Sequence, residues 1–346
     1  MNEGFKKFLS APEKDRVDAF LSAAQHLGAN AQYIEKDFWV CWTLDALYHG
    51  LPAGGPRLLF KGGTSLSKGY GLINRFSEDI DITAFRADLN QAATVEELEA
   101  LSSNGRKVKL DAIRDACQTW VRGTLREGMA ARLVEFVGER GKVELDDSDP
   151  DGQTLLVFYP SVIPAETDYI RPAVRIECGA KSALDPHRET TIRPYVADEV
   201  SSLDIVVTEV TTIDAIRSFW DKAVIAHGLR RWFEIRGELR QEGQRISRHY
   251  YDLHCLEGSP VGAAALADRD LAVNCVRHAR LFFNRPDFDL ASAKPGSWAV
   301  APNAEMLERL RGDYERTAPM IFGTAPTFDA ILGSIERLNS AMNQVE

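Results

Sequence analysis

Apolar positions divide the chain into a mixed front half and a helical back half. Apolar side chains at helical spacing predict one amphipathic helix over residues 30–49, which Gly50 and Pro52 end. Short apolar runs or period-two alternation predict strands at 57–61, 79–83, 154–159 and 173–178. From Ile213 the pattern is helical to the end, with breaks at Gly228, at 258–260, at 284–286 and around Gly296.

The middle of the chain connects these two patterns. Residues 95–137 are helical by period, 138–152 are acidic and loop-like, and 186–191 are expected to form a turn. The strands at 154–159 and 173–178 are expected to pair with each other. Strands and helices followed by helices alone predict an α+β fold, with a core at 1–210 and a helical domain at 211–346.

Composition excludes several classes of protein. The 346 residues are 45% hydrophobic, which is enough for a packed core and excludes wholesale disorder. No apolar run is long enough to span a membrane, and the N-terminus lacks an apolar signal region, so a cytoplasmic protein is expected. The five cysteines are scattered without a C-x-x-C pair, which is typical of a reducing compartment.

Charge is distributed unevenly along the chain. The net charge of −10 argues against a non-specific nucleic-acid binder. Residues 217–248 nevertheless hold eight basic side chains against four acids. Such a run is most often a solvated helix face, and contact with a polyanion is the alternative.

The chemistry is concentrated in a strand, a Gly-Gly-Thr-Ser turn, a short helix and a strand carrying Asp-Ile-Asp. Gly62 and Gly63 allow a sharp turn and the close approach of a phosphate. Thr64 or Ser65 is expected to cap a short helix, whose N-terminus presents free N–H groups to that phosphate. The Ser65 hydroxyl adds a further donor.

Asp79 and Asp81 are two residues apart on a predicted strand, so their carboxylates project from one face. Hard divalent ions such as Mg²⁺ prefer these oxygen ligands and assist phosphoryl transfer. Alone, Gly-Gly-Thr-Ser is usually a turn and Asp-x-Asp a solvated strand end. Together and in this order they indicate phosphoryl chemistry, and the Walker A pattern is absent.

Three further residues are candidates to complete the site. Glu177 lies on an alternating strand and is either a third metal ligand or a surface acid paired with Arg175. Lys222 lies in an apolar helix and either neutralises a triphosphate or pairs with Asp221. Asp252 is flanked by aromatic residues and is expected to be buried, so it needs a partner, for which Lys222, Arg248 or a metal are the candidates.

These motifs resemble the AbiEii/AbiGii nucleotidyltransferase toxins of abortive-infection toxin–antitoxin systems. The signature is FKGGTSLSK at residues 60–68, followed by RFSEDID at 75–81. IEKDFWV at 34–40, the helix around Lys222, RHYYDL at 248–253 and the tail at 320–329 extend the resemblance over roughly residues 30–340.

The resemblance implies a DNA-polymerase-β-like core that uses Mg²⁺ and a nucleoside triphosphate donor. Asp79 and Asp81 would hold the metal, whereas Ser65 and Lys68 would touch phosphates. Lys222 would bind the phosphate tail of the donor, and Asp252 would act beside it as a base or a positioning group.

The resemblance also suggests partners. Some relatives use the 3′ end of tRNA as the acceptor, which stops translation, and the partner would be an antitoxin, often a winged-helix repressor. The arginines of 230–248 would help to hold such an acceptor. Two alternatives stay open: an acceptor hydroxyl on a protein or small molecule, and a nucleotide-binding module without turnover.

Overall fold

The computed structural model describes residues 1–164, 171–240 and 245–344. Contacts group the chain into two compact units. The first unit contains Met1–Tyr70, Phe76–Ala93 and Ser102–Ile213, and the second contains Gly71–Arg75, Thr94–Leu101 and Asp214–Glu346. The division of the chain into domains after residue 210 stays a prediction.

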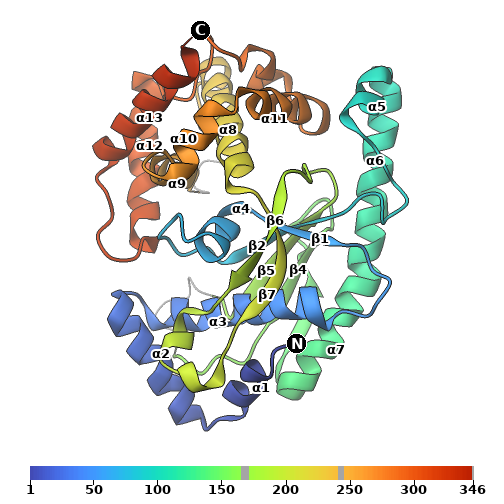
Figure 1. Cartoon of the computed structure of the whole chain (residues 1–346), viewed down its shortest axis with the longest axis vertical. Coiled ribbons are helices and arrows are strands. Elements are labelled where there is room, and N and C mark those ends of the chain that lie inside the picture. The colour runs from blue at the N-terminus through green and yellow to red at the C-terminus, as the bar shows by residue number, and fades with distance from the viewer. Residues whose placement is uncertain (165–170, 241–244, 345–346) are drawn as a thin grey trace. The chain divides into compact units, whose positions relative to one another are not determined.

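A seven-stranded mixed sheet forms the centre of the first unit, in the order β3-β4-β5-β2-β1-β7-β6 among the described residues (Figure 1). The strands are β1 Leu58–Lys61, β2 Asp79–Ala84, β3 Lys142–Leu145, β4 Thr154–Phe158, β5 Ala173–Gly179, β6 His187–Ile192 and β7 Val207–Ile213. β2 pairs antiparallel with β1 and parallel with β5, and β1 pairs parallel with β7. The two strands that flank the Gly-Gly turn are therefore internal to the sheet.

Four strands were predicted and three were not. The strands at 57–61, 79–83, 154–159 and 173–178 are confirmed as β1, β2, β4 and β5, and β4 pairs antiparallel with β5 as expected. The turn at 186–191 is wrong, because these residues form edge strand β6, which pairs with β7. β6 is mostly exposed and so lacks an apolar pattern. The acidic loop likewise contains the short edge strand β3.

Helices cover the sheet of the first unit. They are α1 Glu3–Ser10, α2 Glu13–Leu27, α3 Ala31–Asp45, the short α4 Gly62–Thr64, α6 Ser103–Trp120 and α7 Arg126–Val137, with π-helical turns at Ala46–Gly50, Ser65–Gly69 and Val121–Leu125. α3 contacts β2, β5 and β7 and lies across the strands in Figure 1. The helical period predicted over 95–137 is confirmed by α6, α7 and α5 Val95–Ala100 of the second unit.

α3 is buried on almost all sides, so the prediction of an amphipathic helix is wrong. The sheet covers one side, and two rings from α1 pack against Phe38, with centroids 5.4 Å away for Phe5 and 4.7 Å for Phe8. Asn30 caps the helix by accepting from Gln32 N, and the helical segment ends at Gly50 as predicted. Polar residues within this helix are consequently buried and need partners.

The second unit is helical. Besides α5 it contains α8 Ala215–Arg236, α9 Ser247–Glu257, α10 Pro260–Ala267, α11 Arg269–Phe282, α12 Ala304–Thr317 and α13 Phe328–Asn343. The predicted break at Gly228 is wrong, since α8 continues to a left-handed Gly237. A Cβ on Gly228 would lie 3.2 Å from Phe288 Cγ, so this glycine serves close packing. The predicted α+β class, with a mixed sheet and a helical C-terminal part, is confirmed.

None of the helices in the described residues combines the length and the apolarity needed to cross a membrane. All five cysteines are free thiols, and the Sγ atoms of Cys117 and Cys178 lie 3.9 Å apart in the first unit.

Candidate active site

Gly62 turns the chain directly beside the carboxylate of Asp81. Its φ of +78° lies in the left-handed region, and a Cβ at this position would be only 2.0 Å from Asp81 Oδ2. Lys61 is the register partner of Asp81 across β1 and β2, and its Nζ is 3.5 Å from Asp81 Oδ1. The sharp turn expected from the sequence is present, and glycine is required both for its backbone and for the space that the acid occupies.

The hydroxyls of Thr64 and Ser65 do not cap the helix, so that prediction is wrong. The helix begins at Gly62, and the preceding Lys61 makes no side-chain capping bond. Ser65 Oγ donates back to Gly62 O at 2.9 Å, and Thr64 Oγ1 donates to Asp79 O at 2.5 Å. Thr64 therefore connects the turn to the strand that carries the acids. Gly63 lies between Gly62 and Thr64, which are both held by these hydrogen bonds.

Asp79, Asp81 and Glu177 come from neighbouring strands of the sheet. β2 and β5 run parallel in a register that pairs Asp81 with Glu177. Burial raises the pKa of Asp79, and the charges of Glu78, Glu177 and Asp81 add to this effect. Together they bring the pKa to about 7. The carboxylates therefore repel one another.

This repulsion is the feature that fits a divalent cation, because a cation would relieve it. Asp79 and Asp81 are the residues that would hold Mg²⁺. No group of three or more His, Cys, Asp or Glu side chains placed to hold a metal ion occurs in the part of the chain that the structure describes. Glu177 is contacted by Arg175, which also binds Asp146 Oδ2 at 3.0 Å. A role for Glu177 as a third ligand stays a prediction.

Three consecutive charged residues of α3 are buried, and each binds a different segment of the first unit. Glu35 accepts from Val162 N at 2.7 Å and from Ser161 Oγ. Lys36 pairs with Glu78, the residue before Asp79, at 2.5 Å. In the sequence, these residues belong to the IEKDFWV motif of the family resemblance, and no partner is evident for them. Their signal was three adjacent charges inside an otherwise apolar helix.

Asp37, the third of these residues, binds Lys68. The Asp37 Oδ1–Lys68 Nζ distance is 2.8 Å, and both side chains are buried. Asp37 Oδ2 also accepts from Tyr195 N at 2.7 Å, and Lys68 Nζ lies 3.6 Å from the centroid of the Tyr195 ring. Burial opposes the charge of Lys68, but the carboxylate of Asp37 outweighs it and the pKa of Lys68 is raised. Lys68 thus has a structural partner that the sequence did not predict, with which a phosphate would compete.

A second charged cluster lies within the second unit. Asp252 is fully buried and accepts from Lys222 Nζ at 2.6 Å. It also accepts from Arg75 at both oxygens, with Nε 2.8 Å from Oδ1 and Nη2 2.9 Å from Oδ2. Lys222 is confirmed as a partner of Asp252, and Arg75 was missed because 177 residues separate it from Asp252 in sequence.

The ionisation of Asp252 bears on its two predicted roles. Burial opposes its charge, but Arg75 and Lys222 outweigh burial and hold the pKa of Asp252 well below its usual range. A carboxylate with so low a pKa accepts a proton poorly at neutral pH. Both roles of Asp252, as a base and as a positioning group, stay predictions.

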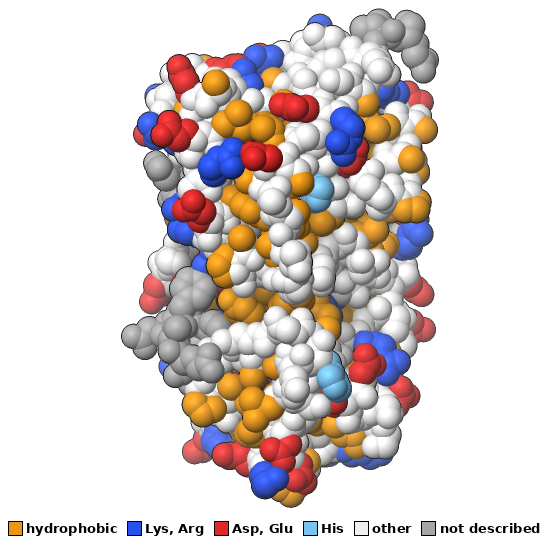
Figure 2. Space-filling model, turned by 90° about the vertical axis from the view of Figure 1, so that its left-hand side faces the viewer, with side chains coloured by type: hydrophobic (Ala, Val, Ile, Leu, Met, Phe, Trp, Pro, Cys, Tyr) orange, Lys and Arg blue, Asp and Glu red, His pale blue; other side chains and the backbone are white. Residues whose placement is uncertain are grey.

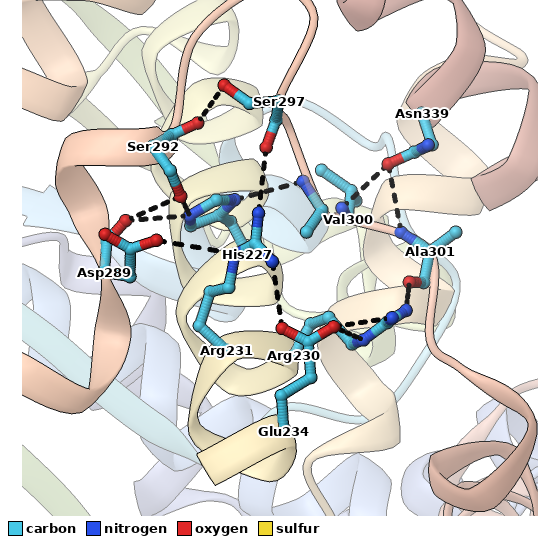
Figure 3. A network of polar contacts seen from close by, with 11 residues as sticks. His227, Arg230, Arg231, Glu234, Asp289, Ser292, Ser297, Val300, Ala301 and Asn339 are labelled. Carbon is cyan, nitrogen blue, oxygen red and sulfur yellow. Dashed lines mark hydrogen bonds and ion pairs between the residues drawn. The ribbon is translucent and has the colours of Figure 1, made fainter.

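Most arginines of the basic run are engaged in internal contacts. Figure 3 shows Arg230 and Arg231 sharing Glu234, with further bonds to Ala301 O at 2.7 Å and Ser297 O at 3.2 Å. Arg236 pairs with Asp287. Acidic and basic side chains are also interspersed on the face in Figure 2. The expected hold of residues 230–248 on an acceptor therefore depends on the remaining cations, such as the exposed Arg248.

Comparison with known proteins identifies the family. No curated protein matches this chain. Among solved structures, MenT4, a nucleotidyltransferase toxin from Mycobacterium tuberculosis, is similar with 15% identity and a TM-score of 0.49, over 94% of this chain and 90% of that one. A sequence profile described as nucleotidyl transferase AbiEii toxin, type IV toxin–antitoxin system, matches residues 45–334. Because that match spans most of the sequence, this chain belongs to the AbiEii family of nucleotidyltransferase toxins.

Proposed function

We propose that this protein is a Mg²⁺-dependent toxin that transfers a nucleotide from a nucleoside triphosphate to the 3′ end of tRNA in the cytoplasm. The observation that carries the proposal is the Asp79–Asp81 pair, which is held against the Gly62 turn and destabilised by mutual repulsion. Family membership supports the reaction class and a cognate antitoxin. A winged-helix antitoxin is part of the proposal.

The side chains of the first unit would prepare the metal site. Bound Mg²⁺ would supply charge neutralisation for the reacting phosphate. Asp79 and Asp81 would hold it, and Asp79 must be deprotonated to do so. Thr64 fixes the backbone at Asp79, and Gly62 leaves the carboxylate of Asp81 unobstructed. Gly63 and Ser65 would complete the turn that faces the phosphates.

In the second unit, Lys222 would neutralise the phosphate tail of the donor. Asp252 would orient its ammonium group through the 2.6 Å hydrogen bond. Because its lowered pKa makes Asp252 a weak base, removal of the acceptor proton is not assigned to it.

The test is a labelling experiment. Purified protein is incubated with Mg²⁺, total cellular RNA and each α-labelled nucleoside triphosphate in turn. We expect label on a tRNA-sized band with the wild type, and a loss of at least about 1,000-fold for Asp79→Ala/Asp81→Ala, since charge neutralisation and alignment provide most of the rate in phosphoryl transfer.

Asp88→Ala is the matched control, because it removes an acid of the same unit that pairs with Arg57 on the surface. It should label RNA as well as the wild type does. Circular dichroism checks that both variants are folded. If the folded double variant still transferred label to RNA, the two acids would not be the metal site.

A hydroxyl on a protein or small molecule is the second candidate acceptor. The internal pairing of Arg230, Arg231 and Arg236 favours it, since few cations of the basic run remain for a polyanion. Omitting RNA and resolving labelled proteins on a gel separates the two acceptors.

A further inference from the structure

Arg75, Lys222 and Asp252 form a buried cluster with an excess of positive charge. Their exposed fractions are 5%, 7% and 0%. Arg75 and Lys222 both bind Asp252, the one acid of the three, so the three side chains together carry a net charge of +1. A buried net charge is unfavourable unless a counter-charge reaches it.

The described groups whose charges act most strongly on the cluster, besides its own members, are cationic or neutral. Arg248, Tyr251 and Cys255 act on the cluster, and His249 is itself affected by the charges of the cluster. Burial, Lys222 and Arg248 lower the pKa of His249 well below its usual value, so it is neutral at pH 7. Burial raises the pKa values of Tyr251 and Cys255, so both are neutral as well.

The Lys222 ammonium has donors to spare. It carries three N–H bonds, and Asp252 Oδ2 is the one acceptor recorded for it among the described residues. Nδ1 of His249, three residues before Asp252 on α9, is also buried without a hydrogen-bond partner in the described chain. These unused polar atoms are what an anionic ligand would satisfy.

Arg75 determines how much of the Lys222 charge is available. Its guanidinium binds both Asp252 oxygens in a bidentate pair, whereas Lys222 binds only Oδ2. Without Arg75, Asp252 and Lys222 would form a neutral pair.

We propose that Arg75 is a positioning residue that keeps Asp252 from neutralising Lys222, so that Lys222 can bind the triphosphate tail of the donor. The inference rests on the proposed function in identifying the anion as a nucleoside triphosphate. Arg75 itself contacts Asp252 and is not assigned a contact with substrate.

The backbone around Arg75 is anchored independently of its side chain. Arg75 forms an antiparallel bridge with Ile321, and Phe322 N donates to Asn74 O at 3.0 Å. Asn74 Nδ2 donates to Phe322 O at 3.1 Å. Arg75→Met removes the guanidinium and leaves these bonds, so the variant should fold.

The experiment measures binding of inorganic tripolyphosphate by calorimetry at pH 7 without metal. We expect Arg75→Met to bind at least about tenfold more weakly than the wild type, because its cluster is neutral. Arg75→Met/Asp252→Asn restores a net charge of +1 and should return to within about threefold of the wild type. A purely structural role for Arg75 predicts no such rescue.

Two further variants complete the design. Arg75→Lys keeps the charge and should lie between the wild type and Arg75→Met. Arg316→Met is the matched control, because Arg316 pairs with Asp313, a different buried acid of the same unit. The affinity of this variant for tripolyphosphate should equal that of the wild type. In transfer assays, Arg75→Met should raise the KM for the triphosphate more than it lowers kcat.

Wild-type affinity in Arg75→Met, or a double variant as weak as the single one, would overturn the inference. So would failure of the wild type to bind tripolyphosphate. If Arg75→Met does not fold, Arg75→Lys carries the test. It keeps the net charge of +1, so it should bind less than about tenfold more weakly than the wild type, and a loss of about tenfold or more there, with Arg316→Met unchanged, overturns the inference. Arg75-dependent binding without transfer to any acceptor would leave the inference standing and reject the proposed function.

Discussion

Asp79 carries a carboxylate that is partly buried among other acids, and this arrangement has a thermodynamic consequence in the absence of metal. In the unfolded chain an aspartate ionises near pH 3.9, whereas Asp79 in the folded protein has a pKa of about 7. Between these values the folded state keeps the proton that the unfolded state loses. Stability therefore falls as pH rises through this window, and the penalty is complete above about pH 7.

We expect Asp79→Asn to be more stable than the wild type in metal-free buffer at pH 8, by on the order of 1–3 kcal/mol. The difference should fall to about 0.5 kcal/mol near pH 4, where the wild-type acid is protonated in the folded state and about half protonated in the unfolded chain. Urea denaturation at both pH values measures it. Added Mg²⁺ should stabilise only the wild type, and a less stable variant at pH 8 would contradict the argument.

Gly62 permits a second residue-scale prediction. Gly62→Ala places a methyl group within 2.0 Å of Asp81 Oδ2 and should abolish nucleotidyl transfer by displacing that acid. Gly54→Ala is the matched control, because Gly54 has a similar φ of +94° but no atom within 4 Å of the added Cβ. Both variants should lose about 1 kcal/mol or more from backbone strain in urea denaturation. Equal activity of the two would show that the contact with Asp81 is unimportant.

At the scale of elements, helix α3 holds the Gly-Gly-Thr-Ser turn through the buried Asp37–Lys68 pair. Removing one partner leaves an uncompensated buried charge, so Asp37→Asn and Lys68→Met should each lower the free energy of unfolding by about 3–5 kcal/mol. The double variant Asp37→Leu/Lys68→Met should lose less than the sum, because no charge remains.

Urea denaturation of the four proteins measures these differences. Lys14→Met is the control, since the Lys14–Asp18 pair is exposed on α2 and should contribute less than about 1 kcal/mol. Equal losses at Lys14 and Lys68 would show that burial does not govern the pair.

Elements with a one-sided apolar pattern could be predicted, and exposed edge elements could not. β2 alternates acid and isoleucine, so its position and the common face of Asp79 and Asp81 follow from the sequence. β6 is exposed along most of its length, so its side chains show no apolar pattern. Its strand conformation comes from backbone pairing with β7. α8 passes through Gly228 because packing against Phe288 overrides the low helix propensity of glycine.

At the scale of the whole molecule, sequence predicted the fold class and the residue types of the site, but few of the long-range partners. The Asp79–Asp81 strand and the Lys222–Asp252 pair were recognised from local pattern and resemblance. Arg75, Lys36 and Asp37 were not singled out, because their partners are distant in sequence. Sequence alone left open whether the basic run is a solvated helix face or a contact for a polyanion, because charge patterning does not show that its arginines pair with Glu234 and Asp287.

The three adjacent charges of α3 also affect how a genetic screen on this toxin family member would be interpreted. A selection for surviving clones would recover substitutions at Glu35, Lys36 and Asp37 together with those at Asp79 and Asp81, since each α3 side chain secures a different segment of the first unit. The first group would lower the amount of folded toxin, whereas the second would leave abundant, inert protein. Immunoblots of the survivors would therefore distinguish substitutions that reduce folding from substitutions that remove activity, which growth alone does not distinguish.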